Sequence, residues 1–452
     1  MNPAAHRHPA SYRDPAGFVF EEDGILYRQI HPRYQPSYEQ LKQSGLYDRL
    51  ISDKLLIPHE EVSQPNTKDA FLIIRPQRVH PVIAPFCWTY NMLQDAALLT
   101  LQIQEIALQY GMTLKDAHPS NIQFIGTKPV LIDTLSFATW NKTKPWIAYR
   151  QYCESFLLPL VIGHYGVRDS PKLLRAWPDG VPLERGRKML PLRSKLSLHW
   201  LLHLHLHARK SEQESNRERS KADFSPAKMN NLIHSLKLAT AQCQSGKNQS
   251  VWTNYEQQVT ERGQYTSHKH NVIQKESAAL PAIDTILDLG SNTGNYSDCL
   301  RNISDKFIQL ESDPQTANAL YKKNKTAGEQ KRLSLCLNIE DLLPAGCDHG
   351  LIPSLKSDLV LCLGLLHHLT YRNNIPLSDV LNLLARLTNK YLWIEFIDPT
   401  DPLILEHFNA ELVENRMIDQ QSFEEQLKTD FTIRYQTKLA DSSRRLYLCE
   451  KK

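Results

Sequence analysis

The 452-residue sequence has few of the features that mark secreted or membrane-spanning proteins. Its eight cysteines include no C-x-x-C pair, and several lie in apolar runs, where a thiol packs as a small hydrophobic group. No uninterrupted apolar run is long enough to cross a bilayer, and residues 1–17 lack the apolar core of a signal peptide. These absences predict a reduced, cytoplasmic protein without a membrane partner.

The chain also has little excess of charge of either sign. The formal net charge is only +4, which gives no general argument for a nucleic-acid partner. Apolar residues make up 41% and charged residues 23% of the chain, as in an ordinary soluble globular protein. A chain of this length is too long for one compact core, so we expect two or three domains.

A mixed-charge run marks the expected domain boundary. Residues 210–221, KSEQESNRERSK, contain almost nothing to bury, which predicts an exposed helix or linker. We place a charged linker at 210–225. A separate α+β accessory domain then occupies residues 1–209, and a second domain occupies residues 226–452.

One stretch of the first domain has a chemical pattern, LKDAHPSNIQFIGTKPVLIDTLSF. Asp116 precedes Asn121 by five positions, and Asp133 closes the following strand. The arrangement resembles the catalytic loop and metal-binding aspartate of protein-kinase-like and aminoglycoside-phosphotransferase-like folds, which implies ATP and magnesium. A glycine-rich loop, a V-A-I-K-like lysine and a Phe-Gly pair after Asp133 are missing. A retained scaffold, a pocket for another ligand, or simple turn and capping roles explain the same side chains.

Histidines crowd the end of the first domain, at positions 199, 203, 205 and 207. His199 and His203 would share one face of a helix, as zinc ligands can. No carboxylate or cysteine lies at a matching spacing, so we expect core or interface histidines and no metal site.

The second domain is organised around residues 286–296, ILDLGSNTGNY. An apolar run that ends in Asp288 is followed by glycines at 290 and 294, which predicts a buried strand, a tight turn and a helix start. Strand-like and helix-like segments alternate to residue 450, which predicts an α/β fold with a doubly wound, mainly parallel sheet. Such sheets bind ligands at the carboxyl ends of their strands.

Polar groups recur at three further strand ends. Glu311 ends the second strand and is well placed to accept hydrogen bonds from ribose hydroxyls. Residues 338–341, NIED, follow the third strand, and residues 364–368, GLLHH, follow the fourth. The four strand ends in chain order predict one nucleotide-like pocket.

Residues 283–450 resemble a class I S-adenosylmethionine-dependent methyltransferase. The resemblance rests on DLGSNTG as the cofactor loop, LESDP as the acidic strand end, NIEDLLP, LCLGLLHHL and the final antiparallel strand pair. It implies a seven-stranded Rossmann-like sheet with S-adenosyl-L-methionine as cofactor. More loosely, the whole chain resembles bacterial methyltransferases of a nodulation-protein-like group. The competing nicotinamide dinucleotide fold would show G-x-G-x-x-G, which is absent here.

The resemblance implies a set of site residues. The methionine part of the cofactor would lie against Asp288, Gly290, Asn292 and Gly294, the ribose against Glu311, and the adenine against Asp313, Asn338, Glu340 or Asp341, with Gly364 in the fourth-strand motif. The segment before the first strand supplies a possible lid over the ligand, with Trp252, Tyr255, Tyr265, His268 and Lys269. Packing of these aromatic residues on the sheet is an equal alternative.

Methyl transfer is an in-line displacement, for which the protein supplies alignment and, for a protonated nucleophile, a base. His367 or His368 is the candidate base, unless it only stacks on the cofactor or caps a helix, and Glu395 is a candidate for orienting the substrate. The acceptor stays open between a small molecule, a saccharide and a protein side chain. Two other functions remain: a bifunctional or kinase-like phosphotransferase, and a non-catalytic cofactor-binding scaffold.

Overall fold

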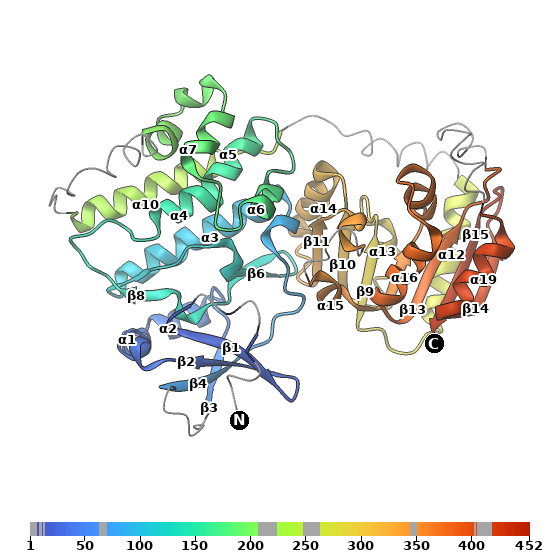
Figure 1. Cartoon of the computed structure of the whole chain (residues 1–452), viewed down its shortest axis with the longest axis horizontal. Helices are drawn as coiled ribbons and strands as arrows, with labels where there is room; N and C mark the ends of the chain where they lie inside the picture. Colours follow the sequence, from blue (N-terminus) through green and yellow to red (C-terminus); the bar gives the residue numbers. More distant parts are fainter. Residues whose placement is uncertain are drawn as a thin grey trace. The chain divides into compact units, whose positions relative to one another are not determined.

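The computed structural model describes residues 7–8, 11, 14–62, 70–206, 224–246, 263–343, 350–401, 404 and 418–452. It has two compact units, Met1–Phe86 with Tyr90–Gly246, and Cys87–Thr89 with Lys247–Lys452 (Figure 1). In the described part of the chain, no helix is both long and apolar enough to cross a membrane.

The first unit begins with a four-stranded antiparallel sheet. Its order is β1 (Gly17–Glu22), β2 (Ile25–Ile30), β4 (Leu72–Pro76) and β3 (His59–Val62). Asp23 and Gly24 have positive φ angles and form the tight turn between the first two strands. Two short helices, α1 (Gln35–Gln43) and α2 (Leu46–Ser52), precede β3.

The helical part of the first unit is built around α3 (Tyr90–Gln109), which Gly111 follows with a φ of 72°. Two small antiparallel pairs come next: β5 (Met112–Leu114) with β8 (Phe137–Thr139), and β6 (Ile122–Ile125) with β7 (Lys128–Leu131). The other described α-helices are α4 (Tyr149–Tyr152), α5 (Leu158–His164), α6 (Leu173–Ala176), α7 (Leu183–Gly186), α8 (Leu198–Trp200) and α10 (Pro226–Ala241).

Helix α10 belongs to the first unit, which extends to Gly246, whereas the expected boundary assigned residues 226–246 to the second domain. Gln94 on α3 donates from Nε2 to the carbonyl oxygens of Thr240 and Cys243. Trp200 Nε1 donates to the carbonyl oxygen of Ala239. Composition alone could not show this packing, because the contact joins residues that are 146 positions apart in the sequence.

The second unit contains the expected seven-stranded sheet. The strands are β9 (Thr285–Leu289), β10 (Lys306–Glu311), β11 (Arg332–Cys336), β12 (Ser357–Cys362), β13 (Thr388–Phe396), β14 (Phe431–Lys438) and β15 (Arg445–Lys451). Their order is β11-β10-β9-β12-β13-β15-β14. The first five strands are parallel, and β15 pairs antiparallel with both β13 and β14. The fold is therefore mainly parallel α/β with an antiparallel end.

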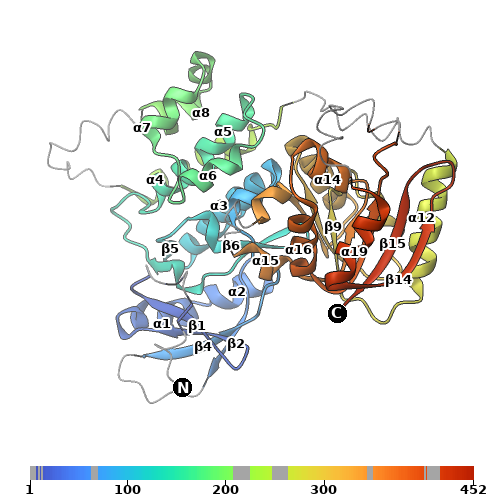
Figure 2. The same cartoon turned by 45° about the vertical axis from the view of Figure 1, so that its right-hand side comes forward.

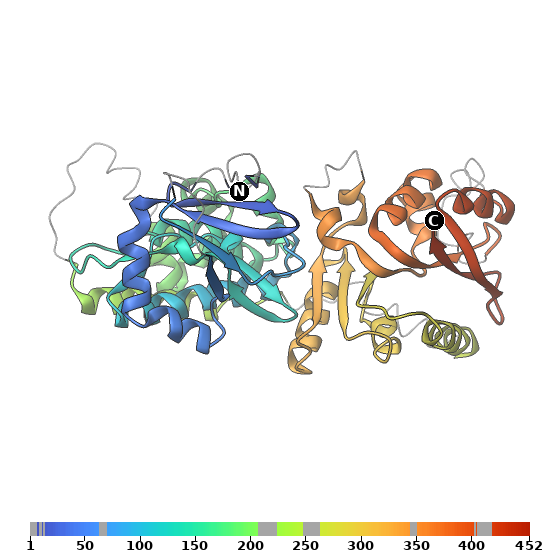
Figure 3. The same cartoon turned by 90° about the horizontal axis from the view of Figure 1, so that it is seen from below.

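Helices cover both faces of this sheet (Figure 3). They are α12 (Gly263–Ala278), α13 (Asn295–Cys299), α14 (Pro314–Thr326), α15 (Leu351–Leu355), α16 (Leu377–Leu387) and α19 (Gln420–Asp430). Helix α16 has apolar residues at helical spacing and buries Leu377, Val380, Leu381 and Leu384. One apolar cluster joins α12 to the sheet and includes Ile273, Phe307 and Trp393.

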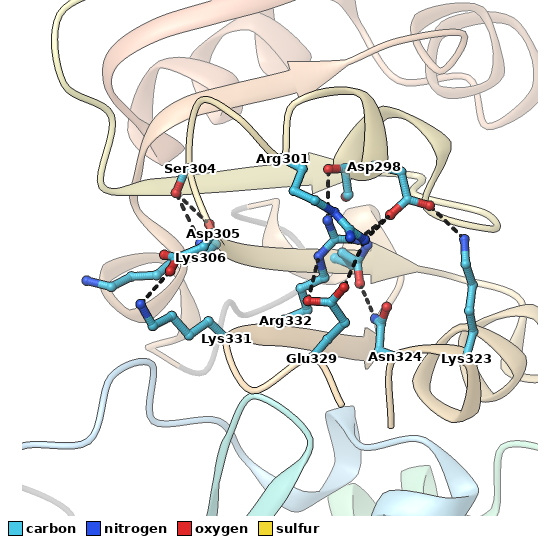
Figure 4. A network of polar contacts seen from close by, with 12 residues as sticks. Asp298, Arg301, Ser304, Asp305, Lys306, Lys323, Asn324, Glu329, Lys331 and Arg332 are labelled. Carbon is cyan, nitrogen blue, oxygen red and sulfur yellow. Dashed lines mark hydrogen bonds and ion pairs between the residues drawn. The ribbon is translucent and has the colours of Figure 1, made fainter. Parts of the chain in front are cut away.

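A polar network joins α13 to α14 and to the first residue of β11 (Figure 4). The Asp298 carboxylate accepts hydrogen bonds from Lys323 Nζ (2.9 Å) and from Arg332. Lys323 Nζ also donates to the carbonyl oxygen of Thr293 at 2.8 Å. Because Thr293 lies in the glycine turn, the network ties that turn to the helix that follows β10.

Candidate functional site

Register brings the strand ends of the second unit together. Leu289 of β9 lies opposite Leu310 of β10 on one side and Cys362 of β12 on the other. Gly290 and Glu311 therefore emerge at the same edge of the sheet, as expected for parallel strands.

A cavity of about 420 Å³ lies at this edge, a size typical of small-molecule sites. Of the expected cofactor residues, Gly290, Asn292, Glu311, Asn338, Glu340 and Gly364 line it. Tyr265, Thr266, Lys269 and His270 of α12 also line it, as do Leu365 and Arg444. The structure thus brings six of the ten expected cofactor residues to one cavity.

The glycine turn adopts the backbone that the sequence pattern requires. Gly290, Asn292 and Gly294 have φ angles of 69°, 45° and 84°, in the left-handed region that glycine enters without strain. Ser291 N donates to the carbonyl oxygen of Leu310 at 2.9 Å. A Cβ on Gly294 would meet Leu320 at 3.0 Å, so this glycine allows close packing of the turn on α14.

Glu311 connects the turn to the second strand end. One carboxylate oxygen accepts from Asn292 N at 3.0 Å, and the other accepts from Asp313 N at 2.9 Å. Burial raises the pKa of the Glu311 carboxyl, and these two backbone hydrogen bonds oppose the rise. Glu311 lines the cavity with its carboxylate already oriented.

Four expected cofactor residues do not line the cavity. Gly294 packs behind the turn, Asp288 is buried, and Asp313 caps α14 by accepting from Thr316 N at 2.8 Å. Asp341 lies in the short helix after β11. These residues shape or support the site, and their contact with a ligand stays a prediction.

Asp288 is a buried acid under the glycine turn. Ser297 Oγ donates to it at 2.8 Å. Burial raises the pKa of Asp288 from 3.8 to about 7, the Ser297 hydrogen bond opposes that rise, and the nearby Glu311 adds to it. The carboxyl is therefore protonated or half-protonated around neutral pH in the ligand-free protein.

Asp288→Asn should flatten the pH dependence of stability in the ligand-free protein. Because the pKa of Asp288 is higher in the folded than in the unfolded state, the folded protein binds more protons between about pH 4 and pH 7. The free energy of unfolding then rises as pH falls through this window, by up to about 1.4 kcal/mol per pH unit. Urea denaturation at several pH values measures the slope.

The matched control is Asp284→Asn, since Asp284 has a side chain 68% exposed in a surface pair with Lys306 and should leave the slope unchanged. Equal slopes for wild type and Asp288→Asn would show that Asp288 does not titrate in this window.

The two candidate base histidines lie differently. His368 lines the cavity, whereas His367 does not and is buried, with its ring centroid 4.0 Å from that of His368. Burial, followed by the charge of His368, holds the pKa of His367 well below its ordinary value. His367 is thus neutral at physiological pH, and His368 is the histidine that a substrate in the cavity can reach.

Glu395 does not line the cavity and lies instead in a buried network of polar side chains. Its carboxylate accepts from Lys269 Nζ at 2.6 Å and from the Tyr265 hydroxyl. Arg444 Nη1 lies 3.7 Å from Glu395 and donates to the Tyr265 hydroxyl at 3.2 Å. Burial opposes ionisation of Glu395, but Lys269 and Arg444 outweigh it and lower the pKa of the carboxyl. Glu395 therefore holds three cavity-lining side chains in place.

Helix α12 supplies the described part of the possible lid segment, and its Tyr265 also packs in the apolar cluster of the sheet, as the alternative expected. A lid role stays a prediction. Tyr265 and Lys269 line the cavity, whereas His268 Nδ1 accepts from Ala440 N at 3.1 Å and does not line it. Trp252 and Tyr255 lie outside the described residues. Arg444 was missed, because a residue just before the last strand shows no local pattern that connects it to a site 150 residues earlier.

The kinase-like residues of the first unit are engaged in contacts within the chain. Asp133 pairs with Arg28 Nη1 at 2.5 Å and accepts from Ser136 Oγ at 2.6 Å. Asp116 accepts from Gln151 Nε2 at 2.8 Å. Asn121 Nδ2 donates to Ser136 Oγ at 3.3 Å. The alternative turn and capping roles match this geometry, since Asp133 also caps the short helix after it.

Three of the four crowded histidines make hydrogen bonds. His203 lies between Tyr149 OH (2.8 Å) and Ser235 Oγ (2.9 Å), and His199 Nδ1 is 3.1 Å from Ser235 Oγ. His205 Nε2 is 2.8 Å from Ser194 Oγ. No group of three potential metal ligands occurs in the described ranges, and His207 falls outside them.

Comparison with known proteins gives one relative along most of the chain. The nodulation protein NoeA of Rhizobium meliloti (strain 1021) is 27% identical over 426 residues, which span 89% of this chain and 87% of that protein. The resemblance of the whole sequence to a nodulation-protein group is thereby confirmed. No protein-family model matches.

Part of the chain is also similar to solved structures named as methyltransferases. The N-methyltransferase NodS from Bradyrhizobium japonicum WM9, in complex with S-adenosyl-L-homocysteine, matches at 11% identity and a TM-score of 0.32, over 41% of this chain and 87% of that one. Magnesium protoporphyrin IX methyltransferase from Synechocystis PCC 6803, with bound S-adenosylmethionine, matches at 14% identity and a TM-score of 0.31, over 46% of this chain and 87% of that one.

Proposed function

We propose that the second unit is a class I methyltransferase that uses S-adenosyl-L-methionine. The observation that carries the proposal is the position of the glycine turn and Glu311 on one cavity, at the reversal point of the sheet order between β9 and β12. The strand order with its antiparallel end also agrees with the resemblance of residues 283–450 to that class.

The residues present fit this cofactor. Gly290 has no side chain at the cavity wall, and a Cβ there would point toward Leu365, which also lines the cavity. The Glu311 carboxylate suits the paired hydroxyls of a ribose, and Asn338 at the end of β11 can hydrogen-bond an adenine edge. When bound, the cofactor supplies a methyl group on a positively charged sulfur.

The chain's own contribution is alignment and proton uptake. Leu363, Gly364 and Leu365 form the wall after β12, and His368 stands beside them. An imidazole can accept a proton from a hydroxyl or amine nucleophile near neutral pH. We assign this role to His368, and a positioning role to Glu395 through Lys269 and Tyr265. The acceptor is a small molecule, a saccharide or a protein side chain, and the first unit selects it or recruits a partner.

Glu311→Gln should weaken binding of S-adenosyl-L-methionine by roughly 10- to 100-fold, because a charged acceptor is lost from a buried hydrogen-bonding position. Glutamine keeps the shape but offers one acceptor oxygen to the two backbone N–H groups of Asn292 and Asp313, so circular dichroism checks the fold of this variant. Isothermal titration calorimetry with the methyl donor measures the affinity. Asp284→Asn is the control, since the Asp284 side chain is 68% exposed and does not line the cavity, and the affinity of this variant should match wild type.

Turnover is tested by adding the protein and radiolabelled methyl donor to cell extract and identifying the labelled molecule. We expect one labelled product class, which disappears in Glu311→Gln at low donor concentration. Donor binding without labelling of any acceptor would favour a non-catalytic scaffold. Stabilisation by ATP with magnesium, lost in Asp133→Ala, would favour the phosphotransferase alternative.

A further inference from the structure

Exposed leucines concentrate in one segment of the first unit. Leu192, Leu196 and Leu198 are 78%, 87% and 64% exposed. Met189 and Leu202 are exposed as well. Monomeric proteins rarely gather large apolar side chains in this way, and such clusters mark interaction surfaces.

The same segment is strongly basic. Residues 185–206 contain five lysines and arginines and no acidic residue. Arg185, Lys188, Arg193 and Lys195 are exposed, and none of them has an ion pair within the described part of the chain. Arg193 lies over the Tyr165 ring at 4.9 Å. We call these four cations and the five apolar residues of the preceding paragraph the leucine-basic surface.

Buried anchors keep the leucines turned outward. Ser194 is buried and its Oγ lies 2.8 Å from His205 Nε2. Trp200 is buried as well, and Gln242 Nε2 donates to Ser197 Oγ at 2.6 Å. Residues between and beside these anchors point away from the core. Figure 2 shows α7, which contains Arg185, and α8, which contains Leu198, close together at one end of the first unit.

The segment that follows this surface in the sequence is polar. Residues 207–223, HARKSEQESNRERSKAD, follow it directly and contain alanines as their only apolar side chains. Within seven residues, Leu192 to Leu198, exposed apolar and cationic side chains are interleaved. That pattern matches a bilayer interface, where acyl chains take the leucines and anionic headgroups take the cations.

We propose that the leucine-basic surface docks the protein on the face of an anionic lipid bilayer. The contact is peripheral and needs no membrane-spanning helix. It departs from the expectation of no membrane partner, which rested on the lack of an apolar run long enough to cross a bilayer. It is independent of the proposed methyl transfer, because no residue of the surface lines the cavity.

The test is co-sedimentation of the full-length protein with vesicles. One set contains equal parts of phosphatidylcholine and phosphatidylglycerol, and the other contains phosphatidylcholine alone. We expect sedimentation with the anionic set only, and release by high salt. Arg193→Gln combined with Lys195→Gln should lower partitioning roughly 30-fold, from the contribution of each cation near an anionic surface.

Leu192→Ser combined with Leu196→Ser should lower partitioning by at least about 10-fold, because two apolar side chains no longer leave water. The matched control is Val82→Ser with Ile125→Ser, two residues that are 51% and 46% exposed elsewhere in the first unit. Exposed positions tolerate such changes, and circular dichroism checks the fold of each variant.

Failure to sediment with anionic vesicles overturns the proposal, as does equal sedimentation of the leucine variant and its control. Light scattering without lipid tests whether a second copy of the chain binds the leucine-basic surface instead of a bilayer. Concentration-dependent self-association that the leucine variant abolishes would show that a second copy of the chain covers this surface instead.

Discussion

We expect Gly290→Val to abolish binding of S-adenosyl-L-methionine. The affinity should fall at least about 100-fold, which is equivalent to about 2.7 kcal/mol. Two effects act together. The φ angle of 69° places valine in the left-handed region, which costs roughly 1–2 kcal/mol. The branched side chain would also project into the cavity wall, since a Cβ added at Gly290 would already lie 3.4 Å from Leu365 Cδ1. Calorimetric titration of the folded variant measures the loss.

Gly328→Val separates backbone strain from filling of the site. Gly328 has a φ of 71°, and nothing lies within 4 Å of a Cβ built there. It follows α14 and does not line the cavity. This variant should lose similar stability and keep the wild-type affinity. Unchanged cofactor affinity in Gly290→Val would contradict the assignment of the cofactor loop. Equal losses of cofactor affinity in the two variants would contradict it as well.

Local patterns predicted the sheet well because each strand and turn has its own signature. Helix α16, for example, follows Pro376 and has regular apolar spacing from Leu377 to Leu387, both of which are visible in the sequence. The positive φ angles at Gly290 and Gly294 follow from the need for a tight turn. Glu311 was found because an acidic residue at the end of the second strand is a local feature of the sequence.

Side-chain partners across long separations could not be predicted. Glu395 was expected to face a substrate, but Lys269 and Arg444 approach it from positions 126 residues before and 49 residues after. Asp133 was weighed as a metal ligand, and Arg28 on another strand occupies its carboxylate. The exposure of Leu192, Leu196 and Leu198 is not visible in the sequence either, because a sequence shows periodicity and not which face lacks a neighbour.

Glu395→Leu should destabilise the protein by about 3–5 kcal/mol, the cost of leaving a buried charge without its partner. Lys269 and Glu395 have side chains 3% and 0% exposed. Burial lowers the pKa of Lys269, but the Glu395 charge outweighs it and keeps the amine protonated. Without that carboxylate, the ammonium loses its hydrogen-bond partner at a position where its side chain is only 3% exposed. Urea denaturation measures the change in the free energy of unfolding.

Lys269→Met combined with Glu395→Leu should recover a large part of that loss, since a buried ion pair replaced by apolar side chains of similar size is often near neutral in stability. The double-mutant cycle measures the coupling between the two residues. Asp284→Asn, in the exposed pair with Lys306, should cost less than about 1 kcal/mol. If Glu395→Leu is as mild as Asp284→Asn, or if the double variant is no more stable than Glu395→Leu, the ion pair is not what holds α12 against the sheet. If the cycle shows strong coupling, Lys269 is held at the cavity by charge, and its loss should then weaken donor binding beyond any change in stability.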